Sequence, residues 1–209
     1  MSLAGIGVAL ATQAKATTFT FLENGSNVDL GPTSTFIEGG FSLTASAFLT
    51  SGGTTDLYAK SASDVDGSSE IGLGTASDPT GDHEITTTSF IQLTLPTIPP
   101  SNFLTIMLGS VQSGESAEVF FTHTAGTLTG ATLIGTVSNG DGSVTIPADD
   151  QTGFIDITAG SVNVLLSSAT FSVVPESGSL TLLGVGLVVI GIEGVRRAVR
   201  AGPIRHQNR

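Results

Sequence analysis

The sequence predicts an all-β protein: a two-sheet antiparallel β-sandwich, jelly-roll-like or Ig-like, with one C-terminal transmembrane helix. Short stretches rich in β-branched and aromatic residues recur between clusters of turn-forming residues, which is typical of β-sandwiches. Glycine accounts for 27 of the 209 residues, and charged residues make up only 12% of the chain. An apolar run near the C-terminus is followed by arginines, which indicates a membrane span.

About eight strands are expected, and turn signals separate them. They cover residues 17–22, 41–48, 86–95, 103–108, 118–122, 131–137, 154–158 and 162–173. Prolines at 96, 99 and 100 interrupt the chain between the third and fourth of these strands, because proline cannot donate to a strand ladder. The Asn-Gly and Asp-Gly pairs within residues 138–142 predict a tight hairpin. No helix and no fixed-period repeat is expected in this part of the chain.

The least regular stretch, residues 52–85, is expected to be a long functional or disordered loop. It contains two clusters of acidic residues, and their carboxylate oxygens are the hard ligands that Ca²⁺ prefers. The candidate ligands are Asp64, Asp66 and Glu70 in the first group, and Asp78, Asp82 and Glu84 in the second. Calcium is therefore a candidate cofactor, and solvated acidic turns are the alternative interpretation. Thr75 stands where an EF-hand loop would have its bidentate glutamate, so the spacing does not predict an EF-hand.

The charge of the central region excludes one class of partner. Between residues 17 and 175, Lys60 is the single lysine or arginine, whereas sixteen residues are acidic. Neutralising a nucleic-acid backbone takes several cations, so nucleic acid is not expected as a partner. The chain has no cysteine, which excludes disulfides and thiolate metal ligands. It also has no tryptophan and only one tyrosine, Tyr58, which weighs against an aromatic sugar-binding platform.

The N-terminus has features of an export signal. An apolar run over residues 3–11 precedes Ala14-Lys15-Ala16, an A-x-A cleavage pattern, although no basic residues precede the run. We therefore expect residues 1–16 to be a signal peptide and residues 17–173 to form the β-sandwich domain. A poorly ordered N-terminus is the alternative interpretation.

The C-terminal segment has the order of a membrane anchor. Residues 179–195 are mostly apolar and near the lower length limit for a helix that crosses a bilayer. Arg196, Arg197 and Arg200 follow as a membrane stop, which predicts that residues 202–209 are a cytoplasmic tail. An amphipathic or core helix is the alternative interpretation.

Val174, Pro175 and Glu176, followed by this Gly/Leu-rich span and the arginines, resemble the PEP-CTERM sorting signal of Gram-negative bacteria. The resemblance covers residues 174–201, and Ser177 stands where the second proline usually does. It implies that an exosortase, a membrane processing enzyme, recognises the tail. It also implies an exported protein, anchored in the inner membrane as a precursor and then delivered to the cell envelope or the extracellular space.

The resemblance further implies a structural or adhesive role in an extracellular polysaccharide matrix, because exosortase systems accompany exopolysaccharide and biofilm production. Exopolysaccharide is thus an expected partner, and no enzymatic activity is expected. A calcium-stabilised carbohydrate-binding module is one alternative. A secreted hydrolase is another, with Glu115 and Glu118 or Asp149 and Asp150 as paired carboxylates, although the sequence has no G-x-S-x-G nucleophile motif.

Overall fold

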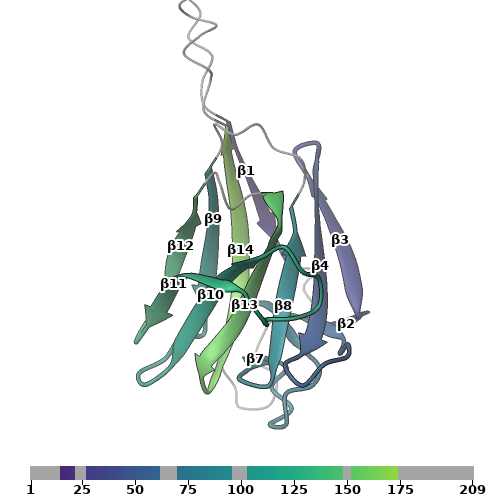
Figure 1. The fold of residues 1–209 in the computed structure, drawn as a ribbon, viewed down its shortest axis with the longest axis vertical. Coiled ribbons are helices and arrows are strands. Elements are labelled where there is room, and N and C mark those ends of the chain that lie inside the picture. The colour runs from purple at the N-terminus through teal and green to yellow at the C-terminus, as the bar shows by residue number, and fades with distance from the viewer. Residues whose placement is uncertain (1–14, 22–26, 62–69, 96–102, 148–151, 174–209) are drawn as a thin grey trace, which may run out of the picture. The chain divides into compact units, whose positions relative to one another are not determined.

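In a computed structural model, the protein forms two antiparallel β-sheets in a sandwich-like arrangement (Figure 1). The structure describes residues 15–21, 27–61, 70–95, 103–147 and 152–173. These ranges contain no α-helix, so the prediction of an all-β domain is confirmed for them.

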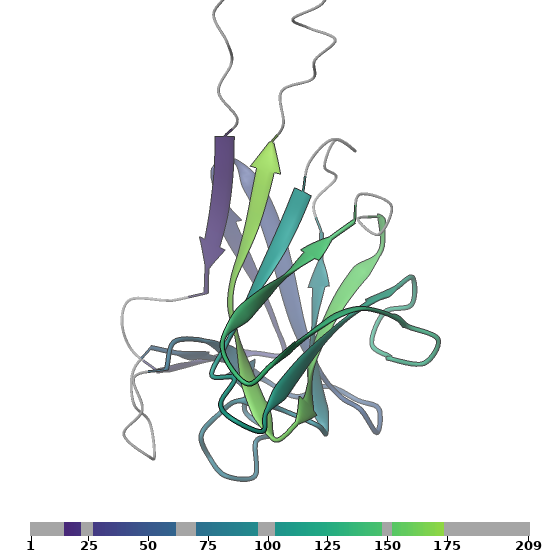
Figure 2. The same ribbon diagram turned by 90° about the vertical axis from the view of Figure 1, so that its left-hand side faces the viewer.

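Within these ranges sheet A has eight strands, and six of them follow the order β12-β9-β14-β6-β5-β2. Its long strand β14 pairs with β9, and also with β7, β6 and β1 at successive positions from its start to its end. Figure 2 shows β14 in yellow-green beside β1 in purple. The strands are β1 (Lys15–Thr20), β2 (Val28–Gly31), β5 (Leu57–Lys60), β6 (Gly72–Thr75), β7 (Ile85–Thr86), β9 (Phe103–Gly109), β12 (Gly142–Ile146) and β14 (Asn163–Val173).

In the part of the chain that the structure describes, sheet B has six strands in the order β11-β10-β13-β8-β4-β3, all paired antiparallel. They are β3 (Thr33–Glu38), β4 (Phe41–Leu49), β8 (Ser89–Thr94), β10 (Ser116–Thr122), β11 (Thr132–Ser138) and β13 (Phe154–Ser161). In Figure 1, β13 lies in front of β14, and β4 and β3 lie to the right of both.

A hydrophobic core lies between the sheets, because side chains alternate along a strand and both sheets direct apolar residues to the same layer. In β4, for example, Leu43, Ala45 and Ala47 are fully buried core residues, whereas the residues between them are partly exposed. Phe19 packs edge-on against Phe171 with the ring centroids 5.6 Å apart, which joins β1 to β14 within this core.

The eight predicted strands are all present, with shifted ends. They correspond to β1, β4, β8, β9, β10, β11, β13 and β14. The hairpin predicted for residues 138–142 is wrong, because β11 pairs with β10 in sheet B while β12 pairs with β9 in sheet A. The turn does form, with a positive φ of 57° at Asn139, but it carries the chain from one sheet to the other.

The prediction of one long irregular loop over residues 52–85 is also wrong, since β5, β6 and the start of β7 lie inside it. The sequence of β6, Gly-Leu-Gly-Thr, is a poor strand signal because glycine has no side chain to pack. The structure explains why Gly74 is required. A Cβ atom there would collide with the backbone of His83 and Glu84, which pass directly over β6.

Several predictions fall outside the described residues. They are the signal peptide up to residue 14, the sorting signal at 174–176, the membrane stop at Arg196, Arg197 and Arg200, and the tail at 202–209. The described ranges contain no helix that is long and apolar enough to cross a membrane, and the predicted span at 179–195 lies beyond them.

Candidate functional site

The best-defined polar site surrounds Lys60, at the end of β5. Along this strand Leu57 joins the hydrophobic core, so by alternation Tyr58 and Lys60 face the opposite side of sheet A. The side chain of Lys60 is nevertheless fully buried. Residues 78–84, which cover this side of β5 and β6, supply its main partners.

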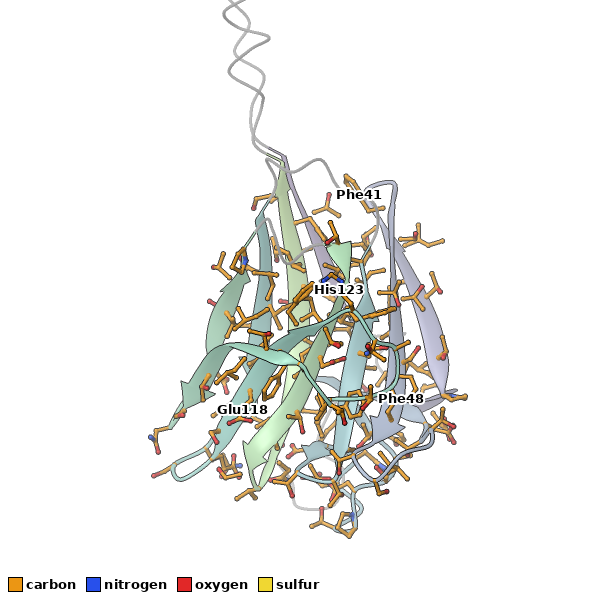
Figure 3. All side chains as sticks on the ribbon, viewed as in Figure 1. Phe41, Phe48, Glu118 and His123 are labelled. Atoms are coloured by element: carbon orange, nitrogen blue, oxygen red, sulfur yellow. The ribbon has the colours of Figure 1, made fainter. Side chains whose placement is uncertain are left out.

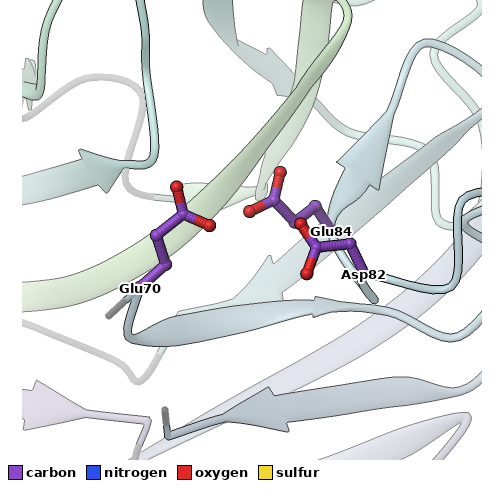
Figure 4. Close-up of side chains that lie close together, drawn as sticks. All are labelled: Glu70, Asp82 and Glu84. Carbon is purple, nitrogen blue, oxygen red and sulfur yellow. The ribbon is translucent and has the colours of Figure 1, made fainter. Parts of the chain in front are cut away.

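The Lys60 ammonium forms ion pairs with three carboxylates. Its Nζ lies 2.6 Å from Asp82 Oδ1, 3.1 Å from Glu70 Oε2 and 3.3 Å from Glu84 Oε1. Their side chains are 11%, 16% and 2% exposed, respectively, so the site is almost closed to solvent. The three carboxyl groups point toward one another (Figure 4), and one oxygen from each lies within 4.8 Å of the others. We call Lys60, Glu70, Asp82, Glu84 and Ser110 the Lys60 cluster.

Ser110 closes the cluster from the end of β9. Its Oγ lies 2.7 Å from Glu70 Oε1 and 2.9 Å from Glu84 Oε1. A hydroxyl has one proton and donates to one acceptor at a time. Both contacts are satisfied together if one carboxyl is protonated, so the geometry favours a proton on one member of the glutamate pair.

Burial identifies the protonated member. It raises the pKa of Glu84 to about 8, a hydrogen bond with Glu70 acts in the same direction, and contacts with Ser110 and Lys60 oppose it. Burial by itself lowers the pKa of Lys60, but hydrogen bonds to Asp82 and Glu70 and the charge of Glu84 outweigh it, so this pKa is raised above its ordinary value. At neutral pH a protonated Glu84 therefore lies beside the Lys60 ammonium.

Asp78 shapes the segment that carries Asp82 and Glu84. Its Oδ1 accepts hydrogen bonds from the backbone N–H (2.9 Å) and the hydroxyl (2.8 Å) of Thr80, and its Oδ2 accepts one from the Glu84 N–H at 3.1 Å. The ring of His83 stacks on Tyr58, with centroids 3.8 Å apart. These contacts fix the turn, in which His83 has a positive φ of 59°.

The sequence prediction and the structure overlap in part. Of the six acids named as calcium ligands, Glu70, Asp82 and Glu84 meet in one place. Asp78 lies beside them but uses both oxygens on its own loop. Asp64 and Asp66 lie outside the described residues. The prediction missed Lys60 and Ser110, although a single lysine among sixteen acids was itself a signal for an ion-paired lysine.

The position of Lys60 bears on calcium binding. A Ca²⁺ ion needs oxygen ligands at about 2.3 to 2.6 Å. Lys60 Nζ already lies within 3.3 Å of an oxygen of all three carboxylates, so an ion bound to them would have to displace it. In this arrangement the ammonium takes the place that a metal cation would occupy.

A second buried acid lies on the outer face of sheet B. Asp156 in β13 is fully buried, and its Oδ1 accepts a hydrogen bond of 2.7 Å from Gln92 Nε2. Its Oδ2 is buried and has no hydrogen-bond partner among the described residues. Burial raises the pKa of Asp156 to about 7, and the contact with Gln92 only partly opposes it. Asp156 therefore titrates near neutrality.

The loop between β10 and β11 lies over Asp156 and Gln92. Residues 123–131, which we call the strap, link β10 to β11 and pass in front of sheet B (Figure 1). Gln92 fastens the strap, since its Oε1 accepts from the Gly126 N–H at 3.1 Å and its Nε2 contacts the Thr124 carbonyl at 3.5 Å. The stacked pair Phe48 and Phe90 lies on the same side, next to Gly126. Figure 3 labels His123 at the start of the strap, with Phe48 to its lower right and Glu118 to its lower left in the view.

The acids considered for hydrolysis have other surroundings. Glu115 Oε2 accepts a 2.6 Å hydrogen bond from the Gln112 N–H, which closes the turn before β10. Glu118 is partly exposed on β10. Asp149 and Asp150 lie outside the described residues.

In comparisons with known proteins, no family model and no curated protein sequence matches this chain.

Proposed function

We propose that the protein is an exported bacterial envelope or extracellular-matrix component with a structural or adhesive role and no enzymatic activity. The observation that carries the proposal is the order of features at the C-terminus: Val174-Pro175-Glu176, an apolar span and an arginine cluster. This order resembles the PEP-CTERM signal, and exosortase would be the processing partner. The span would be a transmembrane helix in the precursor.

Two features of the described domain support a matrix role. Its exposed charges, such as Asp29, Glu38 and Asp141, are acidic, and Lys60 is buried. On the neighbouring strands β3 and β4, exposed hydroxyl groups form hydrogen-bonded pairs. The oxygen–oxygen distance is 3.0 Å both between Thr33 and Ser46 and between Thr35 and Thr44. A hydroxyl-rich, anionic surface stays hydrated and can exchange hydrogen bonds with polysaccharide hydroxyls.

The finer fold assignment belongs to the same proposal. The chain passes between the sheets from β8 to β9, from β9 to β10, from β11 to β12, from β12 to β13 and from β13 to β14. This repeated alternation supports a sandwich of the jelly-roll-like or Ig-like kind.

The alternatives have weaker support. A calcium-stabilised carbohydrate-binding module would need Tyr58 as a sugar platform, but one side of its ring is stacked on His83. A hydrolase would need a carboxylate pair free to act on substrate. Glu70 and Glu84 are close enough, but Lys60 and Ser110 engage both of them.

The sorting proposal is tested by expressing the full chain in a Gram-negative host with and without an exosortase. We expect C-terminal cleavage near Pro175 only in the host that has the enzyme, observed as a loss of mass in the isolated protein. Glu176→Ala should abolish cleavage, whereas Ser177→Pro, which restores the usual motif, should increase the cleaved fraction. Equal processing of all three proteins in both hosts would contradict the proposal.

A further inference from the structure

We propose that Lys60 and Asp82 become joined after folding by an intramolecular amide bond between Lys60 Nζ and Asp82 Cγ, with Glu84 as the proton relay. This modification goes beyond the proposed matrix function and does not depend on it. The bond would link β5 to the segment before β7 and close a covalent ring over residues 60–82.

The first argument is the position of the two reacting groups. Lys60 Nζ lies 2.6 Å from Asp82 Oδ1, the shortest of its three carboxylate contacts. The Lys60 side chain is fully buried, and that of Asp82 is only 11% exposed. The atom to be attacked, Asp82 Cγ, is bonded directly to the oxygen that Lys60 Nζ contacts. Groups that folding holds in a near-attack geometry reach effective concentrations of about 10⁵ to 10⁸ M.

The second argument is the rigidity of the partners. Asp82 lies between Asp78, which fixes the turn through three hydrogen bonds, and Glu84, whose backbone passes over Gly74. Lys60 is held from the other side by pairing of β5 with β6, where it lies opposite Gly72. Nucleophile and acceptor are therefore positioned by independent elements.

The third argument is the neighbouring acid. Glu84 Oε1 lies 3.3 Å from Lys60 Nζ, and its carboxyl lies beside that of Asp82. The Ser110 hydroxyl contacts both Glu70 and Glu84, which favours a proton on one of this pair, so Glu84 can supply a proton to a departing oxygen. Ser110 holds it in place through the 2.9 Å contact.

The reaction balances without a co-reactant. The Lys60 ammonium first passes a proton to the Asp82 carboxylate along their hydrogen bond, which gives a neutral amine and a carboxylic acid. The amine nitrogen then attacks Asp82 Cγ and forms the C–N bond. Glu84 donates its proton to the departing hydroxyl and regains one from the nitrogen, so the products are an amide and one water molecule. The carboxylates favour the ammonium form of Lys60, so bond formation is expected to be slow.

The test is mass spectrometry of the full-length protein after purification, incubation and denaturation. Trypsin should fail to cut after Lys60, because an acylated lysine is not a substrate. A Glu-specific protease should release a branched peptide that joins Lys60 to Asp82 and is lighter than its two parts by one water molecule. Asp82→Ala and Lys60→Arg should lack the branched peptide, and Glu84→Gln should form it much more slowly.

The matched control is Glu118→Gln, which changes an acid on β10, outside the cluster, and should form the branched peptide as the natural chain does. Cleavage after Lys60 in the natural chain, with both peptides at full mass after prolonged incubation, would overturn the proposal and leave an ion pair only. A link from Lys60 to Glu70 or Glu84 would overturn the assignment to Asp82. Because the decisive result comes from the natural sequence, poor folding of a variant would not affect it.

Discussion

Compared with the natural chain before any amide has formed, Lys60→Met should lower the free energy of unfolding by about 3 to 5 kcal/mol, the range for removing one partner of a buried ion pair. The substitution keeps an unbranched chain of similar length but leaves the carboxyl groups of Asp82 and Glu70 without their cation. Chemical denaturation followed by circular dichroism measures the effect.

The cost of Lys60→Met should come from uncompensated charge. Adding Asp82→Asn and Glu70→Gln should therefore recover part of the loss, since neutral groups in a buried site cost less than unpaired charges. An exposed substitution such as Glu38→Gln should change the stability by less than about 0.5 kcal/mol. If Lys60→Met were as mild as Glu38→Gln, the cluster would not be a major source of stability.

The second large effect is a loss of stability as the pH rises. The pKa of Asp156 rises from 3.8 to about 7 on folding, and that of Glu84 rises from 4.5 to about 8. The folded protein thus binds these protons more tightly than the unfolded chain, and their contribution is complete below pH 4 and lost as the pH passes 7 to 8. For Asp156 alone the change is of the order of 2 to 4 kcal/mol. Denaturation at pH 5, 7 and 9 should show this decrease.

Asp156→Asn isolates the part that comes from sheet B. The amide cannot ionise, so above pH 7 the variant should be more stable than the natural chain, and between pH 4 and 7 its stability should depend less on pH. Glu118→Gln on the neighbouring strand β10 is the matched control and should keep the full dependence. An unchanged slope in Asp156→Asn would show that Asp156 ionises normally under the strap.

The sequence predicted some strands of the fold well and missed others. β4 and β14 are long, rich in β-branched or aromatic residues and well bounded by turns, so pattern alone located them. β6 was missed because a tertiary contact, and not a local strand pattern, requires its glycine. At Gly74 the backbone of His83 and Glu84 passes over the strand and leaves no room for a side chain. β12 was not among the predicted strands, and the turn before it predicted a hairpin, because local turn chemistry does not specify which sheet the next strand joins.

The sequence indicated the three acids of the Lys60 cluster but did not identify Lys60 or Ser110 as their partners. Acidic composition pointed to a cation at Glu70, Asp82 and Glu84, and the structure places a cation there, the ammonium of Lys60. Lys60 is ten residues before Glu70 in sequence and comes from a strand that was assigned to a loop, so no local pattern connected them. Asp156 carried no signal at all, since its burial depends on the strap that covers sheet B.

The most direct test of the account is a thermal melt of the full chain with added Ca²⁺ up to about 10 mM, above the dissociation constants of weak extracellular sites. Because Lys60 already neutralises the carboxylates, we expect the melting temperature to be the same with Ca²⁺, with Mg²⁺ and with EDTA. A rise that is specific to Ca²⁺ and reversed by EDTA would contradict the account. It would show that the acidic segment around Glu70, Asp82 and Glu84 binds a metal ion and that Lys60 gives way to it.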